Sequence, residues 1–590
     1  MISIILTIIL NKSYLSNVII FLPGHIPIVV ARTYDSQVEK NNAFGYGWTM
    51  NYEKEIFTTH QIVKEEGSDP PRYTMKSKLI IQNGSGRGVA FSCEGGFLMQ
   101  PNFDFNSIGG TYLPPNFPTE YEKVKVEEFE GVPGCFVVYY KNGMCEVFRK
   151  YQGSVSYLDN SAEPVHKILL WKVLDRNGNS LEINYDTELK ISSVVNSDGN
   201  SASFFYNGSK HITKVQDNYG RFTEYKYNDS GDLTEFTNID GITTEYDYWF
   251  WTVSDSVANT FSSHNLKSIT FPNSSSVTIE YENANTSVSS FMVDKPDCVR
   301  RIAFPSGKSS VFTYNYPNPG QTKVSSVLEA GVFSYVDYNL NYTYTYTSDY
   351  GITTDVSYEL VYVFNPFRTR SLTGDEELPD IGGTGEVTRI TLDSENNVNK
   401  VYDRRPEFPE LATTIDYDTR HNPISITSKT GNLSSFDYDD AGRLIKQTDA
   451  RGNETEYVYN DETWNLVKVI DANGNETVFD YNEKGDMIRK QDSDGFEYFY
   501  SYDGFGNLVS ISRTGSLEGN TVTLTVNYTY DNYGNRLTAI DAKGNLTEYV
   551  YDGFNRLVEV RNHNQGQVYH TYYAYDEMGN RVLRIENCRF

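Results

Sequence analysis

Residues 438–459 read Tyr438-Asp-Asp-Ala-Gly-Arg-Leu-Ile-Lys-Gln-Thr-Asp-Ala-Arg-Gly-Asn-Glu-Thr-Glu-Tyr-Val-Tyr459, and this stretch decides the fold. It contains two Asp-x-x-Gly turn signals, which end at Gly442 and Gly452. An Asp side chain opens such a turn by accepting hydrogen bonds from the backbone that follows, and Gly adopts the positive φ that other residues resist. The segments between the turns have about five to seven residues, the usual length of a strand. The stretch therefore predicts two short strands joined by tight turns.

The second strand of this unit alternates between two kinds of side chain. Thr455, Tyr457 and Tyr459 share one face, whereas the residues between them are Glu456 and Val458. A period of two is typical of a strand that packs on one face and meets water on the other. No comparable apolar period of 3.6 occurs in the chain, so the sequence predicts an all-β protein. A solid core would require Leu and Ile on the packing face, whereas a face of Tyr and Thr can tolerate a wet cavity.

The unit is repeated along the chain. In the last third, eight tyrosines that are each followed by Asp or Asn recur at intervals of 21, 21, 22, 21, 28, 21 and 24 residues, namely Tyr417, Tyr438, Tyr459, Tyr481, Tyr502, Tyr530, Tyr551 and Tyr575. Tyr185, Tyr206, Tyr227 and Tyr248 follow one another at intervals of 21. A fixed period of this size indicates a repeat architecture. The positions that define the repeat are Tyr227, Tyr438, Gly442, Asp449, Gly452, Tyr459, Asp471, Gly474, Tyr481, Tyr530, Asp541, Gly544 and Tyr551.

Composition and charge exclude several classes of protein. The chain has 78 acidic and 51 basic residues, a net charge of −27, and such a field repels nucleic-acid backbones. Aromatic residues make up 14%, too many for a disordered chain. The apolar run Ile2–Leu10 is too short to span a bilayer, and it lacks the basic residue before it and the small-residue cleavage site after it that an export signal needs. We expect either an opening strand there or a start codon placed inside a longer reading frame, and no transmembrane segment elsewhere.

Variation in the repeat divides the chain into five segments. Residues 1–50 are an opening segment, and residues 51–170 are an irregular β region. Residues 171–250 contain the first regular repeats. Residues 251–400 read as degenerate hairpins with an insertion near 374–385, and residues 401–590 return to the regular repeat.

No catalytic, cofactor-binding or metal site is predicted. The acidic residues recur at turn positions in every unit, whereas a catalytic carboxylate pair would be singular. Asp492-Ser-Asp494-Gly495 resembles the start of a calcium loop, but no Glu ligand follows at the required spacing. The eight histidines are scattered, without a His-Glu-x-x-His motif. We therefore expect a chain that is not an enzyme.

Two motifs resemble those of RHS proteins. The pattern Tyr-Asp-x-x-Gly-Asn/Arg-Leu, followed by Asp-x-x-Gly-Asn-x-Thr-x-Tyr-x-Tyr, is similar to their YD repeat. The opening segment contains Pro23-Gly24 and then Arg32-Thr33-Tyr34-Asp35, followed by Phe44-Gly45-Tyr46-Gly47-Trp48. This order is similar to the segment that opens the RHS region of bacterial members. Arg32, Tyr34, Gly47 and Trp48 are the positions that carry the second resemblance.

The resemblance implies an antiparallel strand ribbon that spirals into a hollow β-shell. In bacterial relatives and in insecticidal toxin complexes such shells enclose a C-terminal toxin, and in teneurins a related shell serves adhesion. The Asp-Pro-x-Gly closing signature of toxin-bearing members is absent from the repeats that run to Tyr575 and on to Phe590. We expect a secreted or cell-surface bacterial shell whose passenger or toxin domain is missing here, and which is incomplete or open at its C-terminal end.

A second function remains open from the sequence. Planar tyrosine faces beside acids and amides can stack on sugars, and carbohydrate binding has been suggested for YD repeats. The alternative to the shell is therefore a cell-surface protein that binds glycans or another receptor. Against this, tyrosines such as Tyr457 and Tyr459 recur in every unit, as cross-strand packing partners do.

Overall fold

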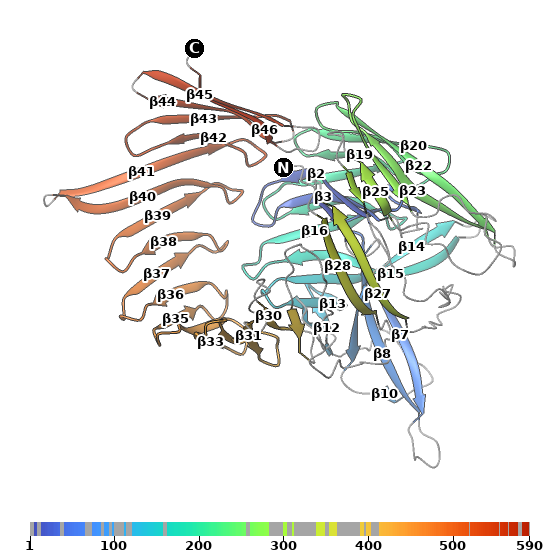
Figure 1. Cartoon of the computed structure of the whole chain (residues 1–590), viewed down its shortest axis with the longest axis horizontal. Coiled ribbons are helices and arrows are strands. Elements are labelled where there is room, and N and C mark those ends of the chain that lie inside the picture. The colour runs from blue at the N-terminus through green and yellow to red at the C-terminus, as the bar shows by residue number, and fades with distance from the viewer. Residues whose placement is uncertain are drawn as a thin grey trace.

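Every regular element that the structure describes is a β-strand (Figure 1). The structure is a computed structural model, and it describes residues 5–8, 13–35, 41–64, 73–83, 88–93, 97–98, 111–113, 121–156, 162–254, 260–281, 299–303, 309–311, 338–347, 353–362, 390–393, 397–402, 412–517, 520–553, 555–564, 566–575 and 581–588. The all-β prediction is confirmed. The described part of the chain contains no helix that could cross a membrane.

The opening segment forms a small sheet of its own. Its strands, in the order in which they pair, are β1 (Ile5–Ile8), β2 (Ser13–Leu22), β3 (Ile28–Asp35) and β6 (Trp48–Met50). Two short strands, β4 (Asn41–Asn42) and β5 (Gly45–Tyr46), pair with each other before β6. The strand expected within Ile2–Leu10 is present as β1.

The next strands form a 20-stranded sheet, called the first ribbon below. Its strands are β7 (Lys54–Lys64), β8 (Tyr73–Asn83), β9 (Gly88–Cys93), β10 (Phe97–Leu98), β11 (Thr111–Leu113), β12 (Tyr121–Phe129), β13 (Val132–Tyr140), β14 (Cys145–Ser156), β15 (Ala162–Leu174), β16 (Ser180–Tyr185), β17 (Ile191–Asn196), β18 (Ser201–Tyr206), β19 (Ile212–Asp217), β20 (Phe222–Tyr227), β21 (Leu233–Thr237), β22 (Thr243–Ser254), β23 (Thr260–Thr270), β24 (Ser276–Tyr281), β25 (Val299–Ala303) and β26 (Ser309–Val311). From β11 to β26 each strand pairs with the next, and β7 also pairs with β15.

The last third forms an 18-stranded sheet, called the second ribbon below. Its strands are β29 (Ile390–Leu392), β30 (Val398–Tyr402), β31 (Ala412–Tyr417), β32 (Pro423–Thr427), β33 (Leu433–Tyr438), β34 (Leu444–Thr448), β35 (Glu454–Tyr459), β36 (Leu466–Ile470), β37 (Glu476–Tyr481), β38 (Met487–Gln491), β39 (Glu497–Tyr502), β40 (Leu508–Leu517), β41 (Asn520–Tyr530), β42 (Arg536–Ile540), β43 (Leu546–Tyr551), β44 (Leu557–Asn564), β45 (Gln567–Tyr575) and β46 (Arg581–Cys588). All pairings are antiparallel between neighbours in sequence, so the ribbon is one long meander.

The degenerate middle of the chain keeps the hairpin plan. β23 and β24 form a hairpin, β25 and β26 form another, and β27 (Tyr338–Thr347) pairs with β28 (Thr353–Tyr362). The insertion predicted near 374–385 lies outside the described residues. β15 and β22 run across the borders at 170 and 250, so these two borders follow the sequence pattern and do not separate one sheet from another.

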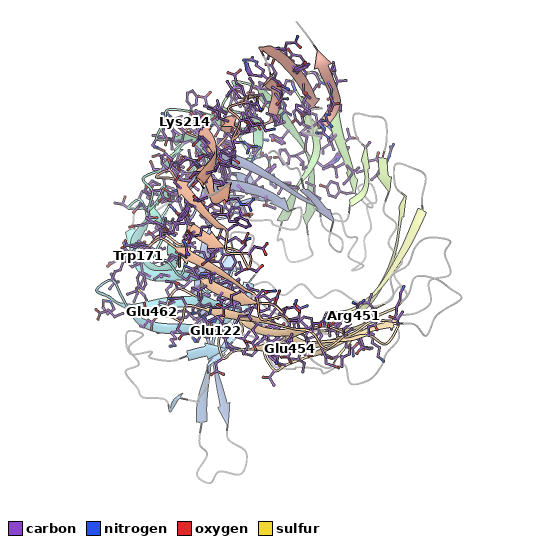
Figure 2. All side chains as sticks on the ribbon, turned by 90° about the vertical axis from the view of Figure 1, so that its left-hand side faces the viewer. Glu122, Trp171, Lys214, Arg451, Glu454 and Glu462 are labelled. Atoms are coloured by element: carbon purple, nitrogen blue, oxygen red, sulfur yellow. The ribbon has the colours of Figure 1, made fainter. Side chains whose placement is uncertain are left out.

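The ribbons bend into a curved wall. In the view of Figure 2 the strands follow one another along an arc that passes Lys214 and Trp171, and Arg451 lies towards one end of it. The same meander therefore gives the curved, shell-like wall that the resemblance implied.

The dense core lies between the first ribbon and the opening segment. Leu22, Ile28 and Val30 are fully buried in one cluster with Ile183 and Val215 of the first ribbon. The opening segment supplies aliphatic side chains that fill the space against this face of the first ribbon. In the second ribbon nearly all described side chains are half-buried or exposed.

The glycine of the repeat turn can be tested without disturbing packing. Gly452 has a φ of 81°, and a Cβ atom there would meet nothing within 4 Å. Gly452→Val should lower the free energy of unfolding by about 1–3 kcal/mol, since a β-branched residue strains the left-handed backbone. Glu456→Ala, at an exposed strand position, should change it by less than about 0.5 kcal/mol. Thermal unfolding of both variants is the measurement, and equal melting temperatures would contradict the strain.

Candidate functional site

The repeat turn is built by its own aspartate. In the turn that begins at Asp449, the Oδ1 atom accepts hydrogen bonds from the backbone N–H of Arg451 at 2.8 Å and of Asn453 at 2.9 Å, and Oδ2 accepts one from Asn453 Nδ2 at 2.8 Å. The bonds from Asn453 lower the pKa of Asp449 below its ordinary value. Asp471 and Asp541 accept the same three bonds in their own turns. Each of these carboxylates therefore accepts hydrogen bonds from groups of its own turn.

The repeat tyrosines bond to the strand that precedes their own in the ribbon. Tyr438, Tyr459 and Tyr481 each donate a hydrogen bond from the hydroxyl to the carbonyl oxygen 15 residues earlier, at 2.9–3.0 Å. Tyr227 does the same at 2.7 Å in the first ribbon. Tyr530 reaches back 22 residues because β40 and β41 are longer than their equivalents. Burial raises the pKa of these hydroxyls, as it does for the half-buried Tyr551, so they remain protonated donors.

The opening motif packs against the first ribbon. Trp48 is fully buried and its Nε1 donates to the Tyr248 hydroxyl at 2.9 Å. The Tyr34 hydroxyl donates to the carbonyl of His264 at 3.1 Å and accepts from the N–H of Leu266 at 2.7 Å. Gly47 has a φ of 75° in the bend that brings Trp48 into place. These contacts fix the opening segment on β22 and β23.

Arg32 is fully buried within a cage of aromatic rings. Its guanidinium carbon lies 4.5 Å from the ring centroids of Trp48 and Phe236 and 5.2 Å from that of Tyr246. Its Nη2 donates to the Tyr246 hydroxyl at 2.5 Å, and its Nε and Nη1 atoms have no hydrogen-bond acceptor in the described part of the chain. Cation–π attraction, rather than a carboxylate, therefore compensates the desolvation of this charge.

The two ribbons meet along a seam of turns, on the side where they face each other in Figure 1. In the first ribbon the seam turns are 175–179, 196–200, 217–221 and 238–242, and in the second ribbon those that meet them are 482–486, 503–507, 531–535 and 552–556. The turns recur at almost the same interval on both sides. Turns of the two ribbons can therefore lie opposite one another along the seam.

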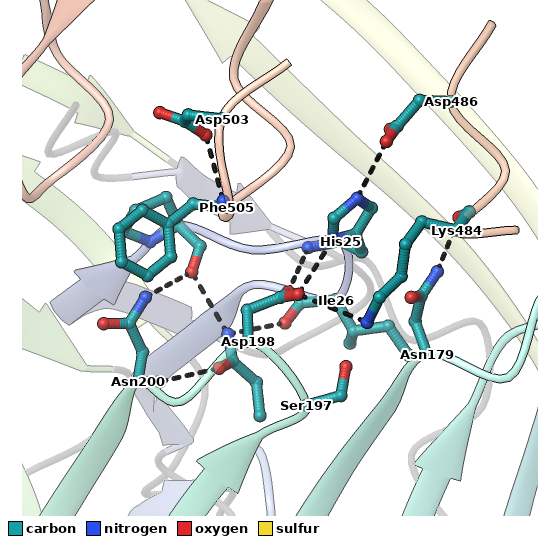
Figure 3. Close-up of polar contacts among 12 residues, drawn as sticks. His25, Ile26, Asn179, Ser197, Asp198, Asn200, Lys484, Asp486, Asp503 and Phe505 are labelled. Atoms are coloured by element: carbon teal, nitrogen blue, oxygen red, sulfur yellow. Dashed lines mark hydrogen bonds and ion pairs between the residues drawn. The ribbon is translucent and has the colours of Figure 1, made fainter. Parts of the chain in front are cut away.

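A single histidine ties three segments together at this seam (Figure 3). His25, in the opening turn, bonds through its backbone N–H and its Nδ1 atom to Asp198 at 2.8 and 2.9 Å. Its Nε2 atom lies 3.0 Å from an Oδ2 atom of Asp486 in the second ribbon. The side chains of His25 and Asp198 are 8% and 2% exposed, so the contact is shielded from water. The opening turn is thus a wedge between the ribbons.

Amides and close packing complete this part of the seam. Asn179 Nδ2 donates to the carbonyl of Lys484 at 2.8 Å. A Cβ atom at Gly485 would overlap the side chain of Asn177. The seam turns thus approach so closely that Gly485 has no room for a side chain.

Further along, rings and charges cross the seam. The Arg221 guanidinium carbon lies 3.1 Å from the ring centroid of Tyr533, and Tyr219 packs edge-on to the same ring at 5.7 Å. Burial, with the nearby charge of Asp552, raises the pKa of Asp240. The seam therefore combines attraction with one repulsive acidic pair.

The sequence singled out the turns and tyrosines but not the seam. The structure places the repeat positions within the ribbons and the opening-motif positions at the buried dock, whereas His25, Asp198 and Asp486 were not among the candidate residues. The one signal for them was the Pro23-Gly24-His25 turn, which belongs to the opening motif. At the calcium-like stretch, Asp492 accepts bonds from the N–H groups of its own turn. Among the described residues no three His, Cys, Asp or Glu side chains lie where they could hold a metal ion.

Comparison with protein families finds two matches. The RHS repeat family matches residues 417–454, 438–476 and 530–568. A domain of unknown function, DUF6531, matches residues 12–70, which include the opening segment.

Two curated toxins are similar in part. The chain is 25% identical over 189 residues to the double-stranded DNA deaminase toxin A of Burkholderia cenocepacia, covering 31% of this chain and 12% of the toxin. It is 24% identical over 183 residues to the tRNA3(Ser)-specific nuclease WapA of Bacillus spizizenii, covering 29% of this chain and 8% of the nuclease. The chain thus matches only about a tenth of the length of each relative.

Solved structures of toxin complexes are also similar. A structure of the Photorhabdus luminescens Tc holotoxin pore aligns with 98% of this chain and 30% of its own, at 11% identity and a TM-score of 0.35. A crystal structure of TcdB2-TccC3-TEV aligns with 98% of this chain and 31% of its own, at 12% identity and a TM-score of 0.34.

The fold and the matched repeats define a class, the antiparallel β-ribbon repeat proteins. Within that class, residues 417–476 and 530–568 match the RHS repeat, and the resemblance indicated by the YD motifs is confirmed.

The close approach at Gly485 allows a matched test of the seam. Gly485 and Gly495 have similar φ values, 89° and 80°, but only at Gly485 would a Cβ atom meet another residue. Gly495→Ala should cost about 1 kcal/mol through backbone strain alone. Gly485→Ala should cost about 1–3 kcal/mol more, because the methyl group must displace Asn177. Denaturant unfolding of the two variants is the measurement, and equal losses would show that the seam does not press on this turn.

The aromatic cage predicts an order of stability among variants of Arg32. Arg32→Ala should lower the free energy of unfolding by about 3–5 kcal/mol, because it leaves a cavity among four rings. Arg32→Met should lose clearly less, since a chain of similar length keeps the packing and removes a buried charge. Thermal unfolding of both proteins would reveal the order. A Met variant as unstable as the Ala variant would mean that the charge itself holds the cage together.

Proposed function

We propose that this chain is the shell of a secreted or cell-surface RHS protein, and that it encloses or presents a further polypeptide without catalysing a reaction itself. The observation that carries the proposal is the seam. Two ribbons with nearly the same turn interval lie turn against turn, and the opening segment is wedged between them through His25. When the two ribbons are joined along their turns, they form one curved wall with an inner and an outer side.

The chemistry of the repeat supports a scaffold. The carboxylates of the repeat turns that begin at Asp449, Asp471 and Asp541 bind backbone and amide groups of the same turn, which leaves little capacity for a substrate. The tyrosine hydroxyls donate to carbonyl oxygens within the ribbon. The side chains that recur most often in the sequence thus build the wall.

The class of the enclosed polypeptide is inferred from the relatives of this chain. Both curated relatives are named as toxins or nucleases, and the chain covers a small share of each. We propose that this wall serves a passenger of the toxin class, whose activity resides outside the repeats. A shell of this kind must open for delivery, so the seam is the feature on which its use depends.

The container role can be tested with a fused probe. An unstructured, epitope-tagged polypeptide is attached after Phe590, and digestion by a broad-specificity protease is followed by immunoblot. In the unaltered shell the tag should survive at least about tenfold longer than the free polypeptide, because the wall excludes the protease. Gly485→Leu, which forces the seam apart, should remove the protection, whereas Gly495→Leu at an open turn should retain most of it.

Circular dichroism of each variant serves as the control for folded strands. A tag digested at the same rate in the unaltered shell and in the free polypeptide would overturn the container role.

A further inference from the structure

The hydrogen bonds of His25 place a demand on its protonation state. Nδ1 faces an oxygen of Asp198 at 2.9 Å and Nε2 faces an oxygen of Asp486 at 3.0 Å. A neutral imidazole has one N–H and one lone pair, so it can donate to only one of these carboxylates. The other nitrogen would then point its lone pair at a carboxylate oxygen. Only the imidazolium form donates to both at once.

Three other turns surround the ring, and two of them place charged groups beside it. The turn 196–200 contributes Asp198, and the turn 482–486 contributes Asp486 and Lys484, whose Nζ lies 3.6 Å from Asp198 Oδ1. The turn 503–507 packs Gly506 against the ring, and its one charged side chain, Asp503, bonds within its own turn. With the ring protonated, two cations face two carboxylates. Without that proton, one lysine is left to balance both.

We propose that His25 is a proton-dependent latch, which strengthens the contact between the two ribbons at the seam while its ring is protonated and weakens that contact when the proton is lost. The bond to Asp198 joins the opening segment to the first ribbon twice, through the backbone and the ring. The bond to Asp486 is the single one that His25 makes to the second ribbon among the described residues. Deprotonation therefore weakens the contact between the ribbons and leaves the opening segment in place.

The direction of the pH dependence follows from the surroundings of the ring. Burial works to lower the pKa of His25, but the hydrogen bonds to Asp486 and Asp198 outweigh it and raise the pKa above its ordinary value of 6.5. The latch thus contributes its full stability below about pH 6.5 and loses it as the pH rises through the raised pKa. The contact between the two ribbons is therefore more stable in mild acid than in mild alkali.

A second histidine at the opening segment behaves differently. His211 Nε2 lies 2.8 Å from Asn41 Oδ1, which joins β4 to the first ribbon. Burial lowers the pKa of His211, so as the pH rises this ring loses its proton before His25 does. The two histidines of this region therefore titrate in opposite directions from the ordinary value, and the His25→Gln variant identifies the part of the pH dependence that belongs to His25.

Hydrogen exchange measured by mass spectrometry tests the latch on the intact chain. Exchange of the seam turns 196–200 and 482–486 is compared at about pH 5.5 and about pH 8.5 with that of the free turn 449–453, after correction for intrinsic rates. In the unaltered protein, protection of the seam turns should fall by about threefold or more over this range. In His25→Gln, whose amide stays neutral, the low-pH protection should be reduced and should no longer change with pH.

A matched control separates the latch from a general effect of pH. His563 pairs with Glu548 at 2.7 Å on the second ribbon, away from the seam. His563→Gln should leave the pH dependence of the seam turns unchanged. Exchange of the core strands β17 and β19 shows whether each variant is folded. If His25→Gln keeps the pH dependence of the unaltered protein, the latch is overturned.

The ring itself provides a second, direct readout. In protein carrying nitrogen-15 in its histidines, the His25 signals, assigned by their loss in His25→Gln, should show both ring nitrogens protonated at about pH 6.5, where a free histidine is half neutral. A ring that loses its proton at or below the ordinary value would overturn the proposal. Neither measurement needs a passenger, so the latch can fail while the container role stands.

Discussion

Two ribbons can lie turn against turn over a long distance only when their turns recur at the same interval. The repeat meets this condition because its turns are closed in the same way, by an Asp or Asn side chain at the first position that accepts a hydrogen bond from the backbone N–H four residues later. One unit carries an insertion, since Tyr502 and Tyr530 are 28 residues apart. Its extra residues lengthen β40 and β41, which extend away from the first ribbon in Figure 1. The turns 503–507 and 531–535 therefore remain neighbours on the seam side, and the interval there is kept.

The opening segment links the wall's core to its seam. Arg32 is enclosed by rings of the opening segment and the first ribbon, and His25, seven residues earlier, reaches the second ribbon. The arginine cage and the aliphatic cluster around Leu22 and Ile28 keep this segment in place. Its position then fixes the distance at which the second ribbon can dock. The well-packed core around the opening segment thus positions His25 for its small, polar contact with the second ribbon.

Much of the ribbon could be predicted from the sequence, because the determinants of its strands and turns are local. The spacing of Tyr438 and Tyr459 and the glycines of each turn gave the strand pairs and the period. The seam could not be predicted, because its partners are far apart: His25 and Asp486 are separated by 461 residues, and Asn179 and Lys484 by 305. The turns on both rims of the second ribbon also share one motif, so nothing local marks the rim that docks.

In the role proposed for this chain, the seam is the place where the wall would open. Within a ribbon each inner strand is held by ladders of backbone hydrogen bonds to both neighbours, whereas across the seam the ribbons share isolated contacts made by side chains. The chain carries a net charge of −27, and Asp240 and Asp552 show that this charge acts across the seam as repulsion. Cations at the same border, Lys484, Arg221 and the ring of His25, offset it. Because one of these cations can lose its charge near neutral pH, the balance between closed and open lies within the reach of a single proton.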